Sequence, residues 1–268
     1  MYVYTQLELI SNKSNISLNK LKRMFYLQNI NITLEVDILL EINNIYNMDC
    51  LEGMKYIDDK SIDLVLTDPP YGIDLTPQRS TGKFYKEKII NDNTLEWLPD
   101  LVEELYRVSK NSVLIFCNWQ NYDKFKQLFE KFFIIKNCIV WDKDWFGMGN
   151  NFRPNHEFIL VCCKTNIKTK SKNISNIIKY RRLHPKKMLH VCEKPVGLLE
   201  ILINELTNEK DVILDCFLGS GSTIESCINT NRNYIGFELN KEYYEITKNR
   251  INKHIIDNNL QDKYNLIT

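Results

Sequence analysis

Short apolar runs alternate with amphipathic stretches along most of the chain. Runs rich in β-branched and aromatic residues predict buried strands, and apolar residues three and four positions apart predict helices that cover them. Strands are expected at residues 44–47, 63–68, 113–117, 132–141, 158–163, 211–216 and 234–237. Helices are expected at 51–57, 96–109, 122–131 and 195–206, after the turn at 219–223 up to about 229, and at 242–253. This alternation predicts an α/β fold.

One α/β domain accounts for most of the 268 residues, a length that suits a single domain. We expect it to cover residues 41–256, because the alternation of strands and helices starts near Ile42. Helical spacing of apolar residues predicts that residues 1–40 form a helical extension, whose role the sequence does not indicate. Residues 257–268 are polar and predict a flexible tail.

Two polar segments interrupt the pattern. Residues 72–94 form a long connection, which in a compact domain is typical of a functional lid or of a disordered segment. Residues 164–187 carry nine Lys and Arg and no acidic residue, although the net charge of the whole chain is only +1. This local charge predicts an arm that contacts phosphates. The basic residues expected to contact DNA are Arg79, Lys83, Lys168, Lys170, Lys172, Lys179, Arg181 and Arg182.

Composition argues against several other classes of protein. The eight cysteines form no Cys-x-x-Cys pair and have no histidine at zinc spacing, so we expect reduced thiols and no metal. No apolar run is long enough to span a membrane, and residues 1–10 lack the pattern of a signal peptide. We therefore expect a cytoplasmic protein.

The stretch Asp68-Pro69-Pro70-Tyr71 ends the second expected strand in an unusual way. Consecutive prolines hold the backbone extended, so the Asp68 carboxylate and the Pro69 carbonyl are fixed at the mouth of the strand. Together they can accept both protons of one exocyclic amine, and the Tyr71 ring offers a flat face for a base. This set suits the N6 amine of adenine or the N4 amine of cytosine.

A strand, a glycine-bearing turn, a helix and a strand that ends in an acid form a nucleotide-binding unit in residues 211–238. Gly219 and Gly221 allow a ligand to approach the backbone, and Glu238 is placed to accept the hydroxyls of a ribose. NAD fits poorly, because Ile224 stands where a dinucleotide fingerprint has its last glycine. The acid Asp215 ahead of the glycines suits a cofactor with a positive amine, such as S-adenosylmethionine.

With both motifs present, the chain resembles the beta-group amino-methyltransferases of DNA, in which the catalytic block precedes the cofactor block. The resemblance covers about residues 42–252 and implies a Rossmann-like, circularly permuted, mostly parallel sheet of seven strands, one of them antiparallel, with helices on both faces. It implies that residues 68–71 hold the target base. It also implies a short basic target-recognition segment at residues 164–189, and that residues 141–143 and 152–157 line the pocket.

The resemblance also implies how S-adenosylmethionine is held. Asp215, Phe217, Gly219 and Gly221 would surround its methionine part, Glu238 its ribose and Asp49 its adenine amine. His190, with the segment from Glu193 to Val196, would meet the cofactor carboxylate. The full expected set of cofactor contacts is Asp49, Cys50, Asp68, His190, Lys194, Pro195, Asp215, Phe217, Gly219, Ser220, Gly221, Ser222, Thr223, Glu238 and Asn240. Val191, Cys192 and Cys216 depart from the usual family residues.

We expect a transfer of methyl to the N6 amine of adenine in double-stranded DNA, inside a bacterial or phage-infected bacterial cell. Methylation of cytosine N4 is the closest alternative, although Ser more often stands at the position of Asp68 there. An RNA or protein-glutamine methyltransferase and a catalytically inactive DNA-binding module are further alternatives. Methylation at cytosine C5 needs a Pro-Cys dipeptide, which the chain lacks. The protein is expected to be a monomer or homodimer, possibly with a cognate restriction endonuclease.

Overall fold

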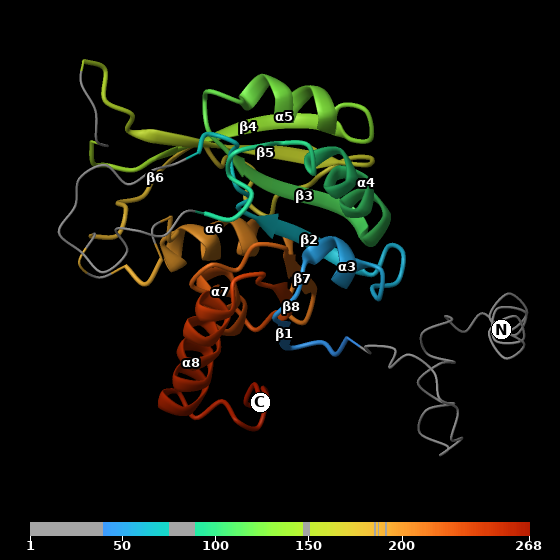
Figure 1. Cartoon of the computed structure of the whole chain (residues 1–268), viewed down its shortest axis with the longest axis vertical. Coiled ribbons are helices and arrows are strands. Elements are labelled where there is room, and N and C mark those ends of the chain that lie inside the picture. The colour runs from blue at the N-terminus through green and yellow to red at the C-terminus, as the bar shows by residue number, and fades with distance from the viewer. Residues whose placement is uncertain (1–39, 75–88, 147–150, 185, 187, 191) are drawn as a thin grey trace, which may run out of the picture.

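The computed structural model describes residues 40–74, 89–146, 151–184, 186, 188–190 and 192–268. In these ranges, eight strands form one sheet in the order β1-β8-β7-β2-β3-β5-β4-β6 (Figure 1). The strands are β1 Asn44–Tyr46, β2 Ile62–Thr67, β3 Ser109–Cys117, β4 Ile134–Asp142, β5 His156–Cys163, β6 Ile177–Lys179, β7 Val212–Asp215 and β8 Asn233–Phe237. The helices are α3 Cys50–Met54, α4 Leu98–Val108, α5 Tyr122–Phe129, α6 Val196–Leu206, α7 Ser222–Asn229 and α8 Lys241–Asp257.

The sheet is mostly parallel, and β5 is its reversed strand, because it pairs antiparallel with both β3 and β4. The predicted α/β fold with one antiparallel strand is therefore confirmed. The number of strands differs from the expected seven, because β6 pairs with β4 at the edge of the sheet. β6 has three residues and only Ile178 is buried, so its hydrophobic pattern is too short to predict a strand.

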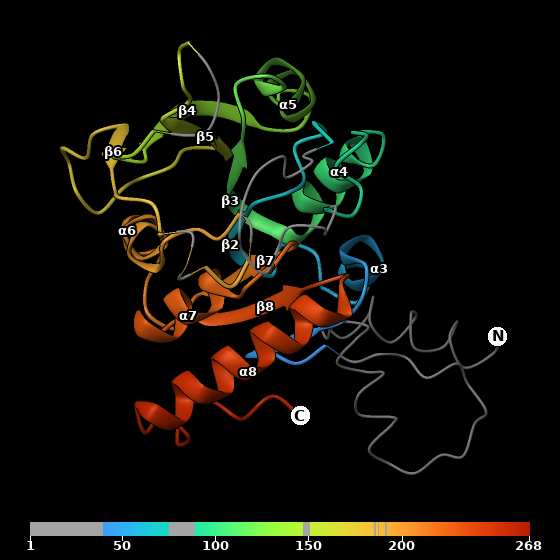
Figure 2. The ribbon, with the colours of Figure 1, turned by 60° about the vertical axis from the view of Figure 1, so that its left-hand side comes forward.

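Two hydrophobic layers cover the two faces of the sheet. Leu64 and Leu66 of β2 pack in the layer beneath α6, α7 and α8, whereas Val65 between them packs in the layer beneath α3, α4 and α5. Successive side chains of a strand point to opposite faces, so a strand buried on both faces is apolar at every position. Figure 2 shows α8 crossing one face of the sheet while α4 and α5 lie on the other.

The direction of the strands decides where the polar residues gather. β1, β8, β7, β2 and β3 run parallel, so their carboxyl ends lie at one edge of the sheet. Asp68 directly follows β2, Asp215 is the last residue of β7, and Glu238 directly follows β8. In open α/β sheets this edge is where ligands bind.

Two residues of the C-terminal segment, which its polar sequence predicts to be a flexible tail, pack against the domain. Tyr264 and Ile267 are both buried. The Tyr264 hydroxyl donates to the Arg232 carbonyl at 3.1 Å, and the backbone N–H of Ile267 donates to Asn252 Oδ1 at 2.8 Å. The apolar side chains in this short segment anchor it against the sheet and α8.

Several predictions lie outside the described residues. They are the helical extension at 1–39, most of the lid, and with it Arg79 and Lys83. Among the described residues, no helix is long and apolar enough to cross a membrane. The same part of the chain holds no cluster of three or more metal-ligating side chains.

Candidate functional site

A cavity of about 160 Å³ opens at the carboxyl edge of the sheet. Residues 68–71 line it on one side, and the turn after β7 lines it on the other. Asp68 and Gly219, which are distant in sequence, therefore face one shared space. This arrangement joins the expected base-binding stretch to the expected cofactor turn.

The base-binding side is organised around the Asp68 carboxylate. Its Oδ1 accepts the Tyr71 hydroxyl at 2.5 Å, and its Oδ2 is paired with the ammonium group of Lys194. Asn121 holds the turn itself, since its side-chain amide donates to the Tyr71 carbonyl at 2.6 Å. Burial raises the pKa of Asp68, and Lys194 acts in the opposite direction.

Glu157 and Lys143 complete a buried network beside Asp68. Glu157 Oε1 accepts from Lys143 Nζ at 2.5 Å, and Glu157 Oε2 lies 3.3 Å from Lys194 Nζ and accepts the Tyr71 hydroxyl at 3.2 Å. Burial would raise the pKa of Glu157, but Lys194 and Lys143 outweigh it and lower that pKa to about 2. Two carboxylates and two ammonium groups therefore balance one another in a water-poor site.

Three carboxylates approach the cofactor side of the cavity. Buried Asp215 accepts from Thr67 Oγ1 at 2.8 Å and from the Phe217 N–H at 3.1 Å. Glu238 accepts the backbone N–H groups of Gly219 and Asn240, at 2.7 and 2.8 Å. Asp49 lines the cavity and also caps α3. The third carboxylate is thus both a helix cap and a cavity residue.

Burial changes the protonation of the polar groups in this half of the site. Desolvation raises the pKa of Asp215 to about 6, and it also raises the pKa of Glu238. Desolvation lowers the pKa of His190 to about 4, so its imidazole is neutral at neutral pH. His190 Nδ1 accepts the Cys192 N–H at 3.1 Å, and its ring stacks edge-on against Tyr243.

The glycine-bearing turn needs glycine for two different reasons. A Cβ on Gly219 would lie 3.3 Å from the His190 ring, so glycine here permits close packing of the two cavity walls. Gly221 has φ +80 at the start of α7, and a Cβ there would lie 2.6 Å from Thr247 Cγ2 of α8. The second glycine thus allows α8 to sit against the turn.

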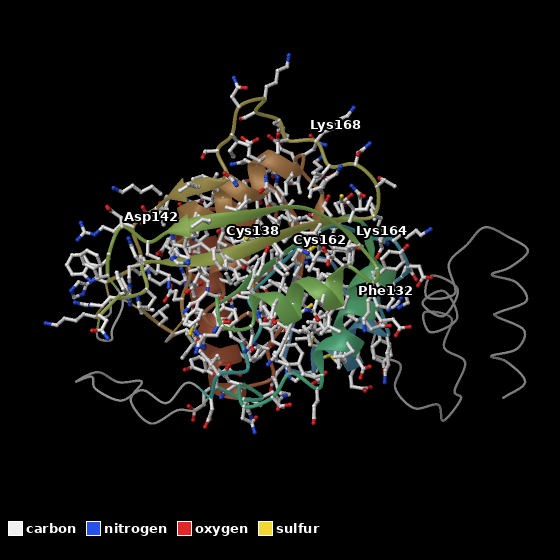
Figure 3. All side chains as sticks on the ribbon, turned by 90° about the horizontal axis from the view of Figure 1, so that it is seen from above. Phe132, Cys138, Asp142, Cys162, Lys164 and Lys168 are labelled. Atoms are coloured by element: carbon white, nitrogen blue, oxygen red, sulfur yellow. The ribbon has the colours of Figure 1, made fainter. Side chains whose placement is uncertain are left out.

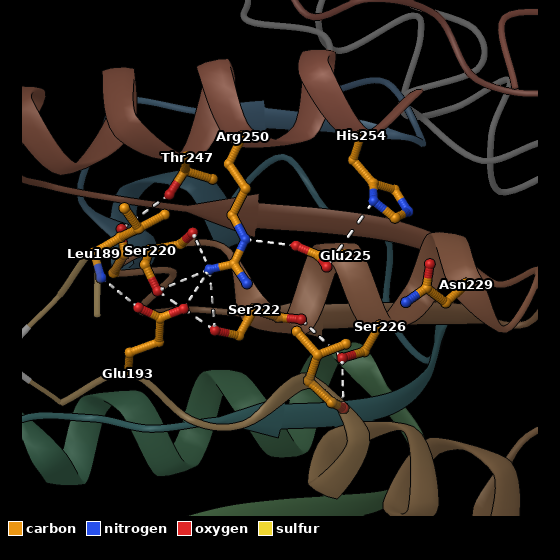
Figure 4. Close-up of polar contacts among 12 residues, drawn as sticks. Leu189, Glu193, Ser220, Ser222, Glu225, Ser226, Asn229, Thr247, Arg250 and His254 are labelled. Carbon is orange, nitrogen blue, oxygen red and sulfur yellow. Dashed lines mark hydrogen bonds and ion pairs between the residues drawn. The ribbon is translucent and has the colours of Figure 1, made fainter. Parts of the chain in front are cut away.

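Arg250 of α8 ties the turn to the segment that carries Lys194 (Figure 4). Its guanidinium lies 2.7 Å from Glu193 Oε1 and 2.6 Å from Glu225 Oε2, and it donates to the Ser220 carbonyl at 3.1 Å. Glu193 in turn accepts the Leu189 N–H at 2.6 Å. Because both partners of the Arg250–Glu193 pair are largely buried, the pair holds the two walls in register.

The cavity gathers most of the expected contacts. Asp49, Cys50, Asp68, Pro69, Pro70, Tyr71, His190, Lys194, Asp215, Phe217, Gly219, Ser220, Ser222, Thr223, Glu238 and Asn240 line it. Pro195 and Gly221 do not, because Pro195 precedes α6 as its N-cap and Gly221 faces α8. Lys194 faces Asp68 and Glu157, so its partners in this structure are carboxylates of the base-binding side.

The basic segment is divided between two edges of the sheet. Figure 3 shows Lys164 and Lys168 at the end of the sheet where Phe132 lies, and Asp142 at the opposite end. The Lys170 N–H donates to the Glu205 carbonyl near the C-terminal end of α6, also away from the cavity. Lys179 pairs in register with Asp142, so Lys179, Arg181 and Arg182 lie at the cavity edge. Within the described part of the chain, the expected DNA-binding residues of the basic segment are therefore not gathered at one place.

The sequence of the chain matches a family model described as a DNA methylase over residues 62–249. The chain belongs to the DNA methylase family. The putative methylase YubD of Escherichia coli (strain K12) is 28% identical over 206 residues, covering 76% of this chain and 87% of that protein. The DNA adenine methyltransferase YhdJ of the same organism is 28% identical over 79% of this chain and 83% of its own length.

The fold is also similar to that of a solved structure bound to S-adenosylmethionine. The crystal structure of the M1.HpyAVI–SAM complex superposes with a TM-score of 0.58 at 28% identity, over 77% of this methylase and 98% of that chain. The cofactor of this methylase is S-adenosylmethionine. The cavity fits it, because the carboxylates of Asp215 and Glu238 line the same space as Phe217, whose ring centre lies 5.6 Å from that of Trp97.

Some residues of the site were not found from the sequence. Tyr243 and Arg250 of α8 and Trp97 at the start of α4 lie outside both motifs, and each contacts the cavity or its walls. Arginine side chains are usually exposed to solvent, so nothing in the sequence indicated that Arg250 is largely buried on the packed face of α8. Only its position opposite Glu193 and Ser220 in the folded chain reveals its role.

Proposed function

We propose that this DNA methylase transfers a methyl group to the N6 amine of adenine in double-stranded DNA. The observation that carries the proposal is the Asp68 carboxylate, held beside Tyr71 in the cavity that also contains the cofactor turn. The name of YhdJ, a DNA adenine methyltransferase, supports the choice of adenine. An adenine inside a duplex must leave the base stack to reach such a cavity, at a cost of a few kcal/mol.

The cofactor-binding wall is suited to hold S-adenosylmethionine. We assign Asp215 to its amine, Glu238 to its ribose and the backbone of residues 219–221 to its methionine part. When bound, the cofactor supplies an electrophilic methyl group. Phe217 and Trp97 shield the site from water, and the neutral His190 packs against Gly219 without adding a charge.

Asp68 and the Pro69 carbonyl accept the two N–H bonds of the target amine in this proposal. An exocyclic amine is a poor nucleophile because its lone pair is delocalised into the ring. Two acceptors that favour a pyramidal nitrogen stabilise the charge that develops on it. Tyr71 is held by Asp68 and Glu157, which leaves its ring in a defined orientation for stacking on the base.

The test uses plasmid DNA from a host that expresses the chain. Mass spectrometry of its nucleosides should show N6-methyladenine, and N4-methylcytosine alone would contradict the choice of base. Asp68→Ala should lower turnover at saturating cofactor by about 100-fold or more, the typical effect of removing one such group. The Kd for the cofactor is measured in parallel, because Asp68 is also an expected cofactor contact. Asp100→Ala, on the outer surface of α4, serves as the matched control.

Methylation of cytosine N4 is the alternative that the same acceptors allow, because cytosine presents a similar amine. A catalytically inactive DNA-binding module is the second alternative. Equilibrium dialysis with labelled S-adenosylmethionine separates it from an enzyme, since an inactive module does not require the cofactor. The number of subunits and a cognate restriction endonuclease remain predictions from the family resemblance.

A further inference from the structure

Three large aromatic side chains are exposed between β4 and β5. Trp145 is 55%, Phe146 65% and Phe152 103% exposed. Single exposed apolar residues are common, but neighbouring exposed aromatic residues mark a surface that contacts something. Neither the acceptors around Asp68 nor the cofactor wall uses these three rings.

Two arginines accompany the rings. The Arg181 guanidinium lies 5.1 Å from the centre of the Trp145 ring, and the Arg153 guanidinium lies 5.8 Å from that of Phe146. We call Trp145, Phe146, Phe152, Arg153 and Arg181 the aromatic–arginine platform. Cationic groups over aromatic rings combine attraction for phosphate with flat faces for bases.

Backbone hydrogen bonds hold the platform together. The Lys143 N–H donates to the Asn155 carbonyl at 2.9 Å, and the Trp145 N–H donates to Asn155 Oδ1 at 3.3 Å. From the stretch that follows β6, the Arg182 N–H donates to the Lys143 carbonyl at 3.0 Å. Three stretches of chain are thus joined where β4 ends, β5 begins and β6 ends.

The platform adjoins the base-binding side of the cavity. Lys143, two residues before Trp145, contacts Glu157, and Glu157 contacts the Tyr71 hydroxyl. Two side-chain contacts thus separate the platform from the Tyr71 side of the cavity, which puts the platform close to where a nucleotide would be extruded. Figure 3 shows that Asp142, next to these segments, lies at the end of the sheet opposite Phe132.

We propose that the aromatic–arginine platform is a DNA-contacting surface, on which the rings pack against the sugars and the base faces that extrusion of the nucleotide exposes, while Arg153 and Arg181 meet phosphates. The inference rests on DNA being the substrate but not on which base is methylated. Charge favours DNA over a second copy of the chain, because self-association would bring the arginines of two copies together.

The test measures DNA affinity with a fluorescent duplex that carries the recognition site, read beforehand by single-molecule sequencing of host DNA. Trp145→Ala and Phe152→Ala should each raise the Kd by about tenfold, a typical effect of losing one stacked base, without changing the salt dependence. Arg153→Gln and Arg181→Gln should each reduce the slope of log K against log salt by about one. The Kd for S-adenosylmethionine should stay that of the parent, which excludes misfolding.

Phe132→Ala is the matched control, because Phe132 is an exposed ring at the other end of β4. A Trp145→Ala/Phe152→Ala variant that binds the duplex as tightly as the parent would overturn the inference. Loss of self-association in sedimentation, with unchanged DNA affinity, would also overturn it and assign the platform to an interface between copies. If the parent methylates DNA and the platform variants bind DNA as tightly as the parent, the platform inference fails and the proposed function stands. If the parent neither binds nor methylates DNA, the proposed function fails as well.

Discussion

Lys194 and Asp68 form an ion pair across the cavity, although they are separated by 126 residues in the sequence. The lysine follows His190 in the segment that the family resemblance assigns to the cofactor carboxylate, yet its ammonium group lies between Asp68 and Glu157. An incoming amine therefore meets an Asp68 whose Oδ2 already has a charged partner. Lys194 connects the protonation of Asp68 to the wall that holds the cofactor.

Replacing Lys194 should change the pH dependence of turnover. Burial raises the pKa of Asp68 and Lys194 opposes that effect, so Lys194→Gln should raise this pKa further. The ionised carboxylate accepts the stronger N–H bond and supplies the negative charge that opposes the positive charge developing on the amine, so activity falls as the pH drops through this pKa. The acidic limb of kcat should move to higher pH by about one unit or more.

Lys126→Gln serves as the control for this experiment, because that lysine pairs with Glu130 on the exposed surface of α5, 2.5 Å away. Its pH profile should match that of the parent. An unshifted acidic limb in Lys194→Gln would show that Lys194 does not influence Asp68.

Cofactor affinity should weaken in acid because of Asp215. Burial raises the pKa of this carboxyl to about 6, so it is mostly ionised at pH 7 and attracts a positive amine. Below pH 6 it becomes protonated and the attraction is lost. Calorimetric titration with S-adenosylmethionine from pH 5 to 8 should show an inflection near pH 6.

The variant Asp215→Asn should bind the cofactor more weakly at pH 7 and should lack that inflection. Glu238 also has a raised pKa, so its own variant, Glu238→Gln, must be titrated in parallel. If the inflection persists in Asp215→Asn, another group is responsible for the pH dependence.

Loss of Arg250 should affect both stability and cofactor binding. Arg250→Met leaves the buried Glu193 carboxylate without its charged partner, which should lower the free energy of unfolding by about 3 kcal/mol. The KM for S-adenosylmethionine should rise more than kcat falls, because Arg250 holds Ser220 of the turn and does not touch the reacting groups. Urea unfolding and steady-state kinetics measure the two effects.

A second substitution distinguishes the charge from the packing. Glu193→Gln in the Arg250→Met background removes the uncompensated charge, so part of the lost stability should return. Additive losses in the double variant would argue that the two residues act independently.

The turn at Gly221 should not tolerate a side chain. Gly221→Ala places a Cβ against Thr247 in a left-handed conformation and should cost about 2 kcal/mol of unfolding free energy. Thr247→Ser removes the nearest methyl group but keeps the hydroxyl that donates to the Gly219 carbonyl at 2.9 Å. In the Gly221→Ala background it should therefore recover part of the loss, whereas full recovery would mean that the backbone conformation costs nothing.

Much of the fold could be read directly from residue patterns. The runs around β2, β3 and β7 are apolar at successive positions, and α4 has an apolar face, so their type followed from local periodicity. β6 could not be predicted, because three residues carry no usable period and its pairing with β4 supplies its stability. The C-terminal segment likewise depends on partners elsewhere, since Tyr264 bonds to Arg232.

The sequence by itself determined the chemical groups at the strand ends of the site, but not Arg250, Tyr243 or Trp97. The strand ends carry Asp68 (with Tyr71 just after it), Asp215 and Glu238. A parallel sheet brings the carboxyl ends of its strands to one edge, independently of the conformation of the loops between them. Only the tertiary structure decided which groups pair, as Lys194 does with Asp68 and Arg250 with Glu193. It also decided that Lys170 bonds to Glu205 of α6 rather than lying with Arg181. A strand or helix is specified by its neighbours along the chain, whereas the partner of a long charged side chain depends on distances across the fold.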